Sequence, residues 1–363
     1  MKITNVKVDV FKWQVEPWRV GAGMRFGGPR QLGVVTVETD EGISGHAFLS
    51  GPNHHAQPLI DIVKPRVMGR DPQDIGAIWR GLWRQTRAVS TSVIGAVDIC
   101  LWDINGKIAG QPIHRLLGTC KDSVPVYSST AYWETKEEYQ EEALRFKEDG
   151  WTAHKIHPHS DPKADVAICE AVREAVGDDM KLMLDSMWAY EYEDSVRVGR
   201  AIEDLDYYWY EDPLAEEDLY SYVKLNEKLD IPIMATEFAP GRYYGMTQWI
   251  TNYATDILRG DVAVTGGITP LVRLCHLAEG FKMKCEIHHG GNSLNNVANL
   301  HVTMAVPNCE FYEFFPCTGS NVYGLAEDID MSGGVVQAPT GPGLGYEIDW
   351  ERLRKDHVGT IGD

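Results

Sequence analysis

Hydrophobic and polar positions divide the chain into two parts with different patterns. In the first part, apolar and polar residues alternate over residues 2–13, 33–39 and 43–49, which is typical of strands with one buried face. Helical spacing then dominates residues 56–117, and Gly118 follows as a C-terminal helix stop. This part of the sequence predicts a small α+β domain.

The second part contains short apolar runs that alternate with amphipathic helical segments. The runs that predict strands are residues 124–128, 153–156, 182–184, 207–210, 231–235, 257–258, 283–287 and 311–315. Eight strands alternating with helices are what a (β/α)8 barrel requires. An open, doubly wound sheet would show the same alternation with fewer units, and no GxGxxG motif follows the first strand. We therefore predict an α/β fold built on a (β/α)8 barrel.

Three acidic residues close three consecutive apolar runs at one interval. Asp185 ends KLMLD, Glu211 ends YYWYE and Glu237 ends IPIMATE, with 26 residues from each to the next. This interval suits one βα unit, so the carboxylates are expected at the same mouth of the barrel. Each one alone has a simpler interpretation as a helix N-cap or a solvated charge. Together they would repel one another, and oxygen ligands without Cys or His favour Mg²⁺, with Mn²⁺ as a substitute.

Basic residues flank these carboxylates on neighbouring runs. Lys155 and His157 are two residues apart, so they share one face of the second barrel strand. His288 closes the seventh run, and Asp261 closes the sixth run 27 residues earlier. An aspartate beside a histidine fixes the tautomer of the ring and raises its basicity. The sequence therefore predicts proton-transfer groups on both sides of a cation, although each histidine alone could be a core or surface residue.

Composition and charge exclude several classes of partner. The chain has 363 residues, 34 Lys and Arg, 53 Asp and Glu, and a formal net charge of −19, which argues against binding to nucleic acid. No apolar run approaches the roughly 20 residues of a membrane-spanning helix, and no signal-peptide core is evident at the start. The seven cysteines form no CxxC pair, so we expect no disulfide framework and a cytoplasmic location.

Several motifs together resemble those of the enolase superfamily, and of its mandelate racemase-like subgroup in particular. AVDICLWDINGKIAGQPIHRLLG at 96–118 is similar to the family's link between capping domain and barrel, and TGPGLG at 340–345 is similar to its C-terminal return. WYEDP at 209–213, ATE at 235–237 and GDVAVTGGIT at 260–269 resemble the motifs of the fourth, fifth and sixth barrel strands. The resemblance covers essentially the whole chain.

The resemblance implies a modified TIM barrel whose mouth is covered by an N-terminal α+β capping domain. The expected boundaries are 1–121 for the capping domain, 122–325 for the catalytic barrel and 326–363 for a C-terminal segment that returns to the capping domain. Family members form dimers to octamers, so a homo-oligomer is expected. Two capping-domain loops, 16–30 and 50–56, should determine specificity. The predicted substrate contacts are Trp18, Arg25, His54, His55 and Asn292.

The resemblance also implies a chemistry. Mg²⁺, held by Asp185, Glu211 and Glu237, would bind the carboxylate of a small substrate and stabilise the enediolate that forms when a base removes the α-proton. Such a proton is far too weakly acidic for a side chain to remove unaided, so a cation at the developing oxyanion is needed. Glu313 matches the acid of the eighth strand, which in the family contacts the substrate or the catalytic network.

The base itself stays open between three residues. The second-strand motif is commonly Lys-x-Lys, and here it is Lys155-Ile156-His157. By register His157 would be the base and Lys155 the partner of the substrate carboxylate, whereas His288 would be the acid or the base. Met187 stands where Asn is frequent, and Arg259-Gly260-Asp261 stands where Gln-Pro-Asp is frequent.

The leading hypothesis is an acid-sugar dehydratase of the aldonate or aldarate type, with a 2-keto-3-deoxy acid as its product. A racemase, epimerase or cycloisomerase would use the same residues and is the nearest alternative. A metal-dependent hydrolase on the barrel, with His157-Pro158-His159 as its metal pair, would leave the three carboxylates unexplained. A non-catalytic binding protein would not need bases around the cation.

Overall fold

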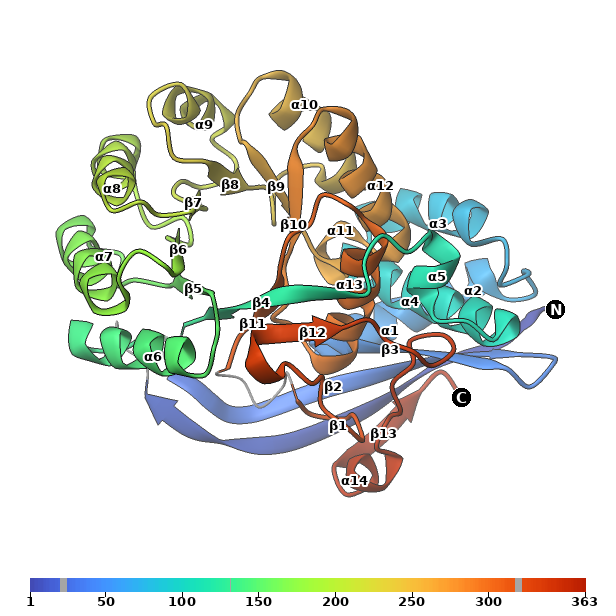
Figure 1. The fold of residues 1–363 in the computed structure, drawn as a ribbon. Helices are drawn as coiled ribbons and strands as arrows, with labels where there is room; N and C mark the ends of the chain where they lie inside the picture. The colour runs from blue at the N-terminus through green and yellow to red at the C-terminus, as the bar shows by residue number, and fades with distance from the viewer. Residues whose placement is uncertain (20–24, 131, 317–321) are drawn as a thin grey trace.

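The computed structural model describes residues 1–19, 25–130, 132–316 and 322–363, without the side chains of residues 17–26. In this part of the chain, eight parallel strands curve into a nearly closed barrel, and an antiparallel sheet lies beside it (Figure 1). The predicted α/β fold, a barrel with an N-terminal cap, is therefore confirmed. Among these residues, every helix is too short or too polar to span a lipid bilayer.

The antiparallel sheet combines the two ends of the chain. Its strands, in spatial order, are β13 (His357–Ile361), β1 (Ile3–Arg19), β2 (Arg25–Thr39) and β3 (Ser44–Ser50). Alternate residues Val6, Val8 and Val10 of β1 are buried, which explains the period of two in the sequence. Val8 pairs with Ile361, so the C-terminus closes the edge of the N-terminal sheet.

The expected loop 16–30 is largely the distal end of a two-stranded ribbon. In the backbone register, Trp18 lies opposite Phe26 and Arg19 opposite Arg25, so residues 16–19 and 25–30 belong to strands, and residues 20–24 lie outside the described part of the chain. The prediction of a loop at 50–56 is also wrong in part, because helix α1 (Pro52–Pro58) begins inside this range. A proline occupies the first turn of this helix, where it is tolerated. The sequence did not indicate either difference, because Gly, Pro and aromatic residues obscure the hydrophobic period in both segments.

The capping region also contains several helices, of which α4 (Thr91–Ala109) contacts both this sheet and the barrel. The others are α1, α2 (Lys64–Val67), α3 (Ile75–Trp83) and α5 (Ile113–Leu117). Where β3 crosses α4, a Cβ at Gly45 would lie 2.0 Å from the carbonyl oxygen of Cys100. Only glycine permits this close approach of strand and helix.

The barrel strands follow the predicted runs closely. They are β4 (Ser123–Ser129), β5 (Ala153–Ile156), β6 (Lys181–Asp185), β7 (Trp209–Glu211), β8 (Ile233–Ala235), β9 (Ile257–Gly260), β10 (Lys284–Ile287) and β11 (Tyr312–Phe314). The helices between them are α6 (Lys136–Glu148), α7 (Pro162–Val176), α8 (Tyr192–Asp204), α9 (Leu219–Asn226), α10 (Met246–Thr251), α11 (Val262–Thr265), α12 (Ile268–Gly280) and α13 (Ser293–Ala305). Buried side chains on both faces of the strands explain why the runs are continuously apolar.

A buried carboxylate bridges the gap in the barrel between β10 and β11. The hydrogen-bonded strand order runs from β10 round to β4 and β11, and it contains no direct pairing of β10 with β11 among the residues described. Glu286 of β10 accepts hydrogen bonds from the backbone N–H groups of Glu310, at 2.8 Å, and Phe311, at 3.2 Å. The side chain thus supplies acceptors where a neighbouring strand would otherwise do so.

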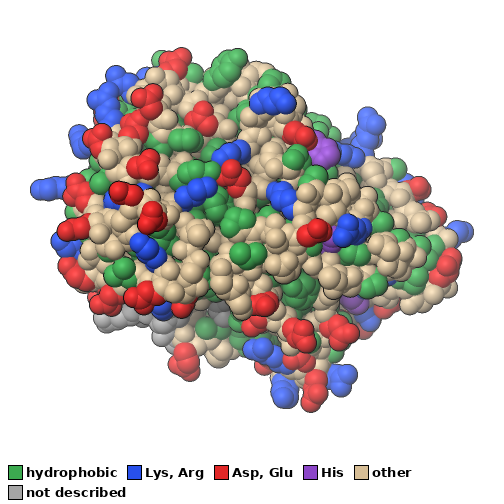
Figure 2. Space-filling model, in the orientation of Figure 1, with side chains coloured by type: hydrophobic (Ala, Val, Ile, Leu, Met, Phe, Trp, Pro, Cys, Tyr) green, Lys and Arg blue, Asp and Glu red, His purple; other side chains and the backbone are tan. Residues whose placement is uncertain are grey.

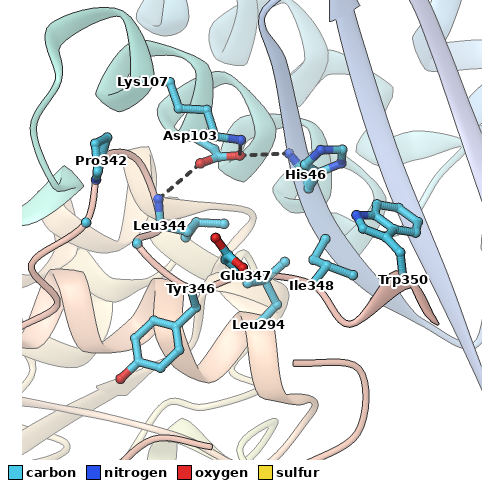
Figure 3. A pocket seen from close by; sticks show the side chains of 12 residues that line it. His46, Asp103, Lys107, Leu294, Pro342, Leu344, Tyr346, Glu347, Ile348 and Trp350 are labelled. Carbon is cyan, nitrogen blue, oxygen red and sulfur yellow. Dashed lines mark hydrogen bonds and ion pairs between the residues drawn. The ribbon is translucent and has the colours of Figure 1, made fainter. Parts of the chain in front are cut away.

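The C-terminal segment ties the two sheets together. After β12 (Val335–Gln337), which pairs with β4, the chain passes α14 (Trp350–Arg354) on its way to β13. Figure 3 shows Asp103 of α4 at the junction, where its carboxylate accepts from the N–H groups of His46 and Leu344, both at 3.0 Å. Lys107 donates to the same carboxylate at 2.6 Å. One side chain therefore joins β3, α4 and the C-terminal loop.

We predict that Asp103→Ala lowers the free energy of unfolding by about 3 kcal/mol, because it leaves two backbone N–H groups without an acceptor at a junction where Asp103 itself is 2% exposed. Urea unfolding monitored by circular dichroism measures the change. Asp122→Ala is the control, since Asp122 is 85% exposed in its pair with Arg115 and should contribute little. Equal stability of the two variants would show that the junction is not held by Asp103.

Candidate active site

Side chains along each barrel strand point alternately into and out of the barrel, so the inward-facing residues form layers, and the site consists of these layers. A layer of inward-facing apolar side chains forms the barrel floor, and it comprises Tyr127, Ala153, Met183, Trp209, Met234, Ile257 and Phe311. Two residues further along their strands, Lys155, Asp185 and Glu211 face inward above this floor. Asp185 and Glu211 are directly paired in the ladder of β6 and β7. The apolar floor thus excludes water from beneath a layer of charged groups.

A cavity of about 550 Å³ lies above the floor. Its ionisable lining residues are Lys155, His157, Asp185, Asp212, Glu237, His288, His289 and Glu313. Its apolar and aromatic lining residues are Tyr132, Met187, Trp188, Phe238 and Phe315. The structure therefore brings most of the predicted catalytic and metal-binding residues into one cavity, with Glu211 and Asp261 directly behind it.

Lys155 is enclosed by carboxylates. Its Nζ lies 3.1 Å from Asp185 Oδ2, 3.0 Å from Glu211 Oε2 and 2.8 Å from Glu313 Oε1, and the side chain is 1% exposed. Burial and Arg259 lower the pKa of Lys155, but Glu211 and Glu313 outweigh them and raise it well above the usual range. A lysine held in its charged form is suited to stabilise negative charge and unsuited to remove a proton.

Arg259 is a second buried cation that was not among the site residues predicted from the sequence. Its Nη2 donates to Glu313 Oε2 at 2.6 Å, its Nη1 donates to Tyr127 at 3.1 Å, and its Nε lies 2.7 Å from Glu211 Oε1. These pairs place it among the carboxylates. Its position two residues after the floor residue Ile257, directly behind the apolar run 257–258, was the signal that could have identified it.

The three predicted metal ligands fit Mg²⁺ in chemistry and in location. All three are carboxylates at the ends of consecutive barrel strands, and hard cations prefer such oxygen ligands. Burial raises the pKa of Glu211 to about 7, against the opposing effect of Arg259, and burial also raises the pKa of Glu237. Both shifts show that these buried anions lack part of the positive charge they require.

The side chains as placed satisfy much of that requirement with protein cations. Lys155 contacts Asp185 and Glu211, and Arg259 lies between Glu211 and Glu237, whose Oε2 is 3.7 Å from Nε. In the described part of the chain, no three His, Cys, Asp or Glu side chains are arranged to hold a metal ion. Ion binding at this site therefore requires these carboxylates to turn from the cations toward a common point.

Each ring nitrogen of His157 faces a hydrogen-bond acceptor. Nδ1 donates to the carbonyl oxygen of Thr130 at 2.8 Å, and Nε2 lies 3.0 Å from Asp185 Oδ2. In this arrangement Nε2 donates to the carboxylate. It becomes the unprotonated nitrogen that a general base needs only when Asp185 turns away and the neutral ring keeps its proton on Nδ1. His159, the other half of the alternative metal pair, instead bonds the carbonyl of Trp133.

His288 and Asp261 form the predicted pair. Nδ1 of His288 lies 3.0 Å from Asp261 Oδ2, and Asn299 donates to the same oxygen at 3.1 Å and to the carbonyl of His288 at 2.8 Å. Burial lowers the pKa of His288, but Glu237 and Asp261 outweigh it and raise the pKa to about 9. At neutral pH this ring is an imidazolium and can act as an acid.

The wall of the cavity is more apolar than the sequence predicted. Trp188 is held rigidly, because its backbone N–H donates to the carbonyl of Asp212 at 2.7 Å and its Nε1 donates to Asp212 Oδ2 at 3.1 Å. Its ring meets Phe238 at 89° with centroids 5.8 Å apart. Trp188 and the adjacent Met187 both adopt positive φ, of 64° and 47°. Such strain in non-glycine residues is typical of functional sites.

The predicted substrate contacts are only partly described. The side chains of Trp18 and Arg25 lie outside the described residues. His54 and His55 are on α1 and do not line the cavity, and Asn292 caps α13 by accepting from the N–H of Asn295 at 2.9 Å. These five contacts stay predictions.

Comparison with known proteins covers most of the chain. Residues 3–118 match the family model described as mandelate racemase / muconate lactonizing enzyme, N-terminal domain, and residues 138–352 match the model described as enolase C-terminal domain-like. The crystal structure of D-glucarate dehydratase from Agrobacterium tumefaciens complexed with magnesium is 33% identical, with a TM-score of 0.90 over 99% of this chain and 100% of that chain.

Two curated relatives show the range of chemistry among similar proteins. An arabinonate dehydratase from Saccharolobus solfataricus is 28% identical over 88% of this chain and 89% of its own length. A D-galactarolactone cycloisomerase from Agrobacterium fabrum is 28% identical over 97% of this chain and 98% of its own. Proteins of similar length and equal similarity thus carry two kinds of reaction.

We predict that His288 stays protonated from neutral pH to about pH 9 in the protein with EDTA, and that Asp261→Asn lowers its pKa. Because the folded pKa exceeds the ordinary 6.5, the stability that His288 contributes is complete below pH 6.5 and is lost as the pH rises through about 9. A ¹⁵N NMR titration of the imidazoles measures the pKa, and His276→Asn assigns an exposed control histidine. A pKa near 6.5 in the unaltered protein would contradict the prediction.

Proposed function

Because the chain belongs to the mandelate racemase / muconate lactonizing enzyme family, within the enolase superfamily, we propose that it is a Mg²⁺-dependent acid-sugar dehydratase. Its product would be a 2-keto-3-deoxy acid. The observation that carries this proposal is the His288–Asp261 pair at 3.0 Å, which lies across strands β6–β8 from Lys155 and His157. An elimination needs a base and an acid, and the cavity presents one candidate on each side.

In this proposal His157 removes the proton at C2. Its Nδ1–H donates to the carbonyl of Thr130, so Nε2 can serve as the base once Asp185 turns from His157 toward the ion. The electron pair of the C–H bond becomes part of an enediolate, and Lys155 stabilises the negative charge that develops on the carboxylate. Mg²⁺ bound by Asp185, Glu211 and Glu237 would supply further positive charge at those oxygens.

His288 acts as the acid in the second half of the reaction. With Nδ1 bonded to Asp261, the opposite nitrogen, Nε2, donates its proton to the hydroxyl at C3. The C3–O bond breaks, water leaves, and the enediolate pair forms the C2–C3 double bond of an enol. The enol then becomes the 2-keto-3-deoxy acid by taking a proton at C3, so the net reaction is the loss of one water.

The proposal also concerns the substrate and the type of reaction, which is either the elimination of water or an isomerisation. Arabinonate and D-glucarate dehydratases among the similar proteins favour dehydration. The aromatic wall formed by Trp188 and Phe238 favours a substrate with a C–H face that can stack, which a lactone also has. Cycloisomerisation of such a lactone is therefore the second candidate, with the ring oxygen as the leaving group. A homo-oligomer stays a prediction.

We predict that Glu211→Gln lowers Mg²⁺-dependent turnover by about 10³-fold while the fold is retained, because a ligand is lost but buried negative charge is relieved. A panel of aldonates, aldarates and lactones, assayed for 2-keto acid by the semicarbazone absorbance, identifies the substrate and measures turnover. Normal turnover by this variant would show that the metal assignment is wrong. A 2-keto acid that forms only from the lactones and keeps the mass of the lactone, with no loss of water, would select the cycloisomerase.

The roles of the two histidines are separated by exchange in D₂O. We predict that His288→Asn retains exchange of the C2 hydrogen but loses dehydration by at least about 10²-fold, whereas His157→Asn loses both. Proton NMR of the recovered substrate measures the exchange. If His288→Asn loses exchange as well, His288 is the C2 base, and if it retains both activities, the pair with Asp261 is structural.

A further inference from the structure

Glu237 does not lie at the inward position that its own strand provides. Met234 of β8 belongs to the barrel floor, so the next inward position is Thr236. A regular strand would turn Glu237 outward, yet Glu237 lines the cavity. The other two predicted metal ligands lie in phase with their strands, two residues after a floor residue. The equal intervals in the sequence therefore conceal a local departure at Glu237.

The backbone of Thr236 produces this departure. Its φ is 96°, in the left-handed region that residues with a Cβ rarely adopt. Its side chain takes the place of regular strand pairing, because Oγ1 donates to the carbonyl of Arg259 at 3.0 Å and accepts the N–H of Arg259 at 2.9 Å. The strand is thus tied to β9 while its direction changes, and the next side chain enters the cavity.

A buried carboxylate from another loop holds the new direction. Glu216, which follows β7, accepts the N–H of Thr236 with Oε1 at 2.5 Å and the N–H of Phe238 with Oε2 at 2.6 Å. Glu216 is 2% exposed and does not line the cavity. Its two oxygens therefore hold the backbone at Thr236 and at Phe238, the two residues that flank Glu237, and we call Glu216 with Thr236 the carboxylate clamp.

We propose that Glu216 is a positioning residue for Mg²⁺ binding, which it supports through the clamp by fixing the direction of Glu237. The inference rests on the proposed function, because it takes Glu237 as a ligand of the ion. A strained backbone persists only where surrounding contacts determine it, and the two hydrogen bonds to Glu216 provide such contacts. Without them Thr236 can relax toward a regular strand, which turns Glu237 away from the cavity.

The test compares Glu216→Gln with Glu217→Gln. The first variant keeps the shape of the side chain but places an amide NH₂ against one of the two backbone N–H groups, so one bond is lost. The second alters the adjacent, exposed residue in the same way. Isothermal titration with MgCl₂ should show at least about tenfold weaker binding for Glu216→Gln and the wild-type affinity for Glu217→Gln.

Two further readouts separate positioning from general stability. The melting temperature of Glu216→Gln in EDTA should fall, because one buried N–H loses its acceptor, but its turnover should recover at raised Mg²⁺ concentration, which a loss of stability alone would not produce. If Glu216→Gln does not fold, Glu216→Asp replaces it, because the shorter side chain keeps a carboxyl group but cannot reach both backbone N–H groups. Glu216→Asp should weaken Mg²⁺ binding in the same direction.

The outcomes distinguish the inference from the proposed function. Wild-type protein that binds Mg²⁺ together with clamp variants that bind it equally well would overturn the inference and leave the function intact. Wild-type protein that does not bind Mg²⁺ would overturn both. Weaker binding by the clamp variants, with Glu217→Gln unaffected, supports the role of Glu216.

Discussion

Repulsion among buried carboxylates is the constraint on which the barrel mouth depends. Asp185, Glu211 and Glu313 lie close enough to share the ammonium group of Lys155, in a region with an apolar floor and little water. Charges at such separations interact far more strongly there than in water, so each acid needs a cation. Arg259 supplies a permanent positive charge, and in the proposed function a divalent ion is the further partner of Asp185 and Glu211. The same charges hold Lys155 as a cation and restrict the choice of base to the histidines.

Backbone departures at the strand ends place these groups more exactly than regular strands could. Positive φ occurs at Trp188 after β6, at Asp212 after β7 and at Thr236 after β8. Each is tied by hydrogen bonds from a neighbouring loop, as in the contacts of Trp188 with Asp212. Alternation along a strand offers one inward side chain in two, whereas a left-handed residue at its end can bring a further side chain into the cavity. Precision in the site is thus obtained from strain that tertiary contacts maintain.

The cavity has a charged side and an aromatic side, and each suits a different part of the proposed substrate. Charged groups on the barrel strands suit the carboxylate and the reacting carbons, and the rings of Trp188 and Phe238 suit the C–H face of the remaining part. The antiparallel sheet beside the barrel is fixed by the Asp103 junction and by the C-terminal strand β13, so the ends of the chain hold the cap against the catalytic barrel. Chemistry therefore belongs to the barrel, and the position of its cover depends on residues distant in sequence.

The sequence by itself determined the barrel, its eight strands and the positions of Asp185 and Glu211, because burial and alternation are local properties that leave a period in the chain. It also predicted the pairing of Asp261 with His288, since the two residues are separated by one βα unit. Only the tertiary structure showed that Arg259 enters the site, that Glu216 holds the strand before Glu237, and that the cavity wall is aromatic. These features depend on which side chains from distant segments share a buried space, and neither charge balance nor a left-handed residue leaves a period that can be read along the chain.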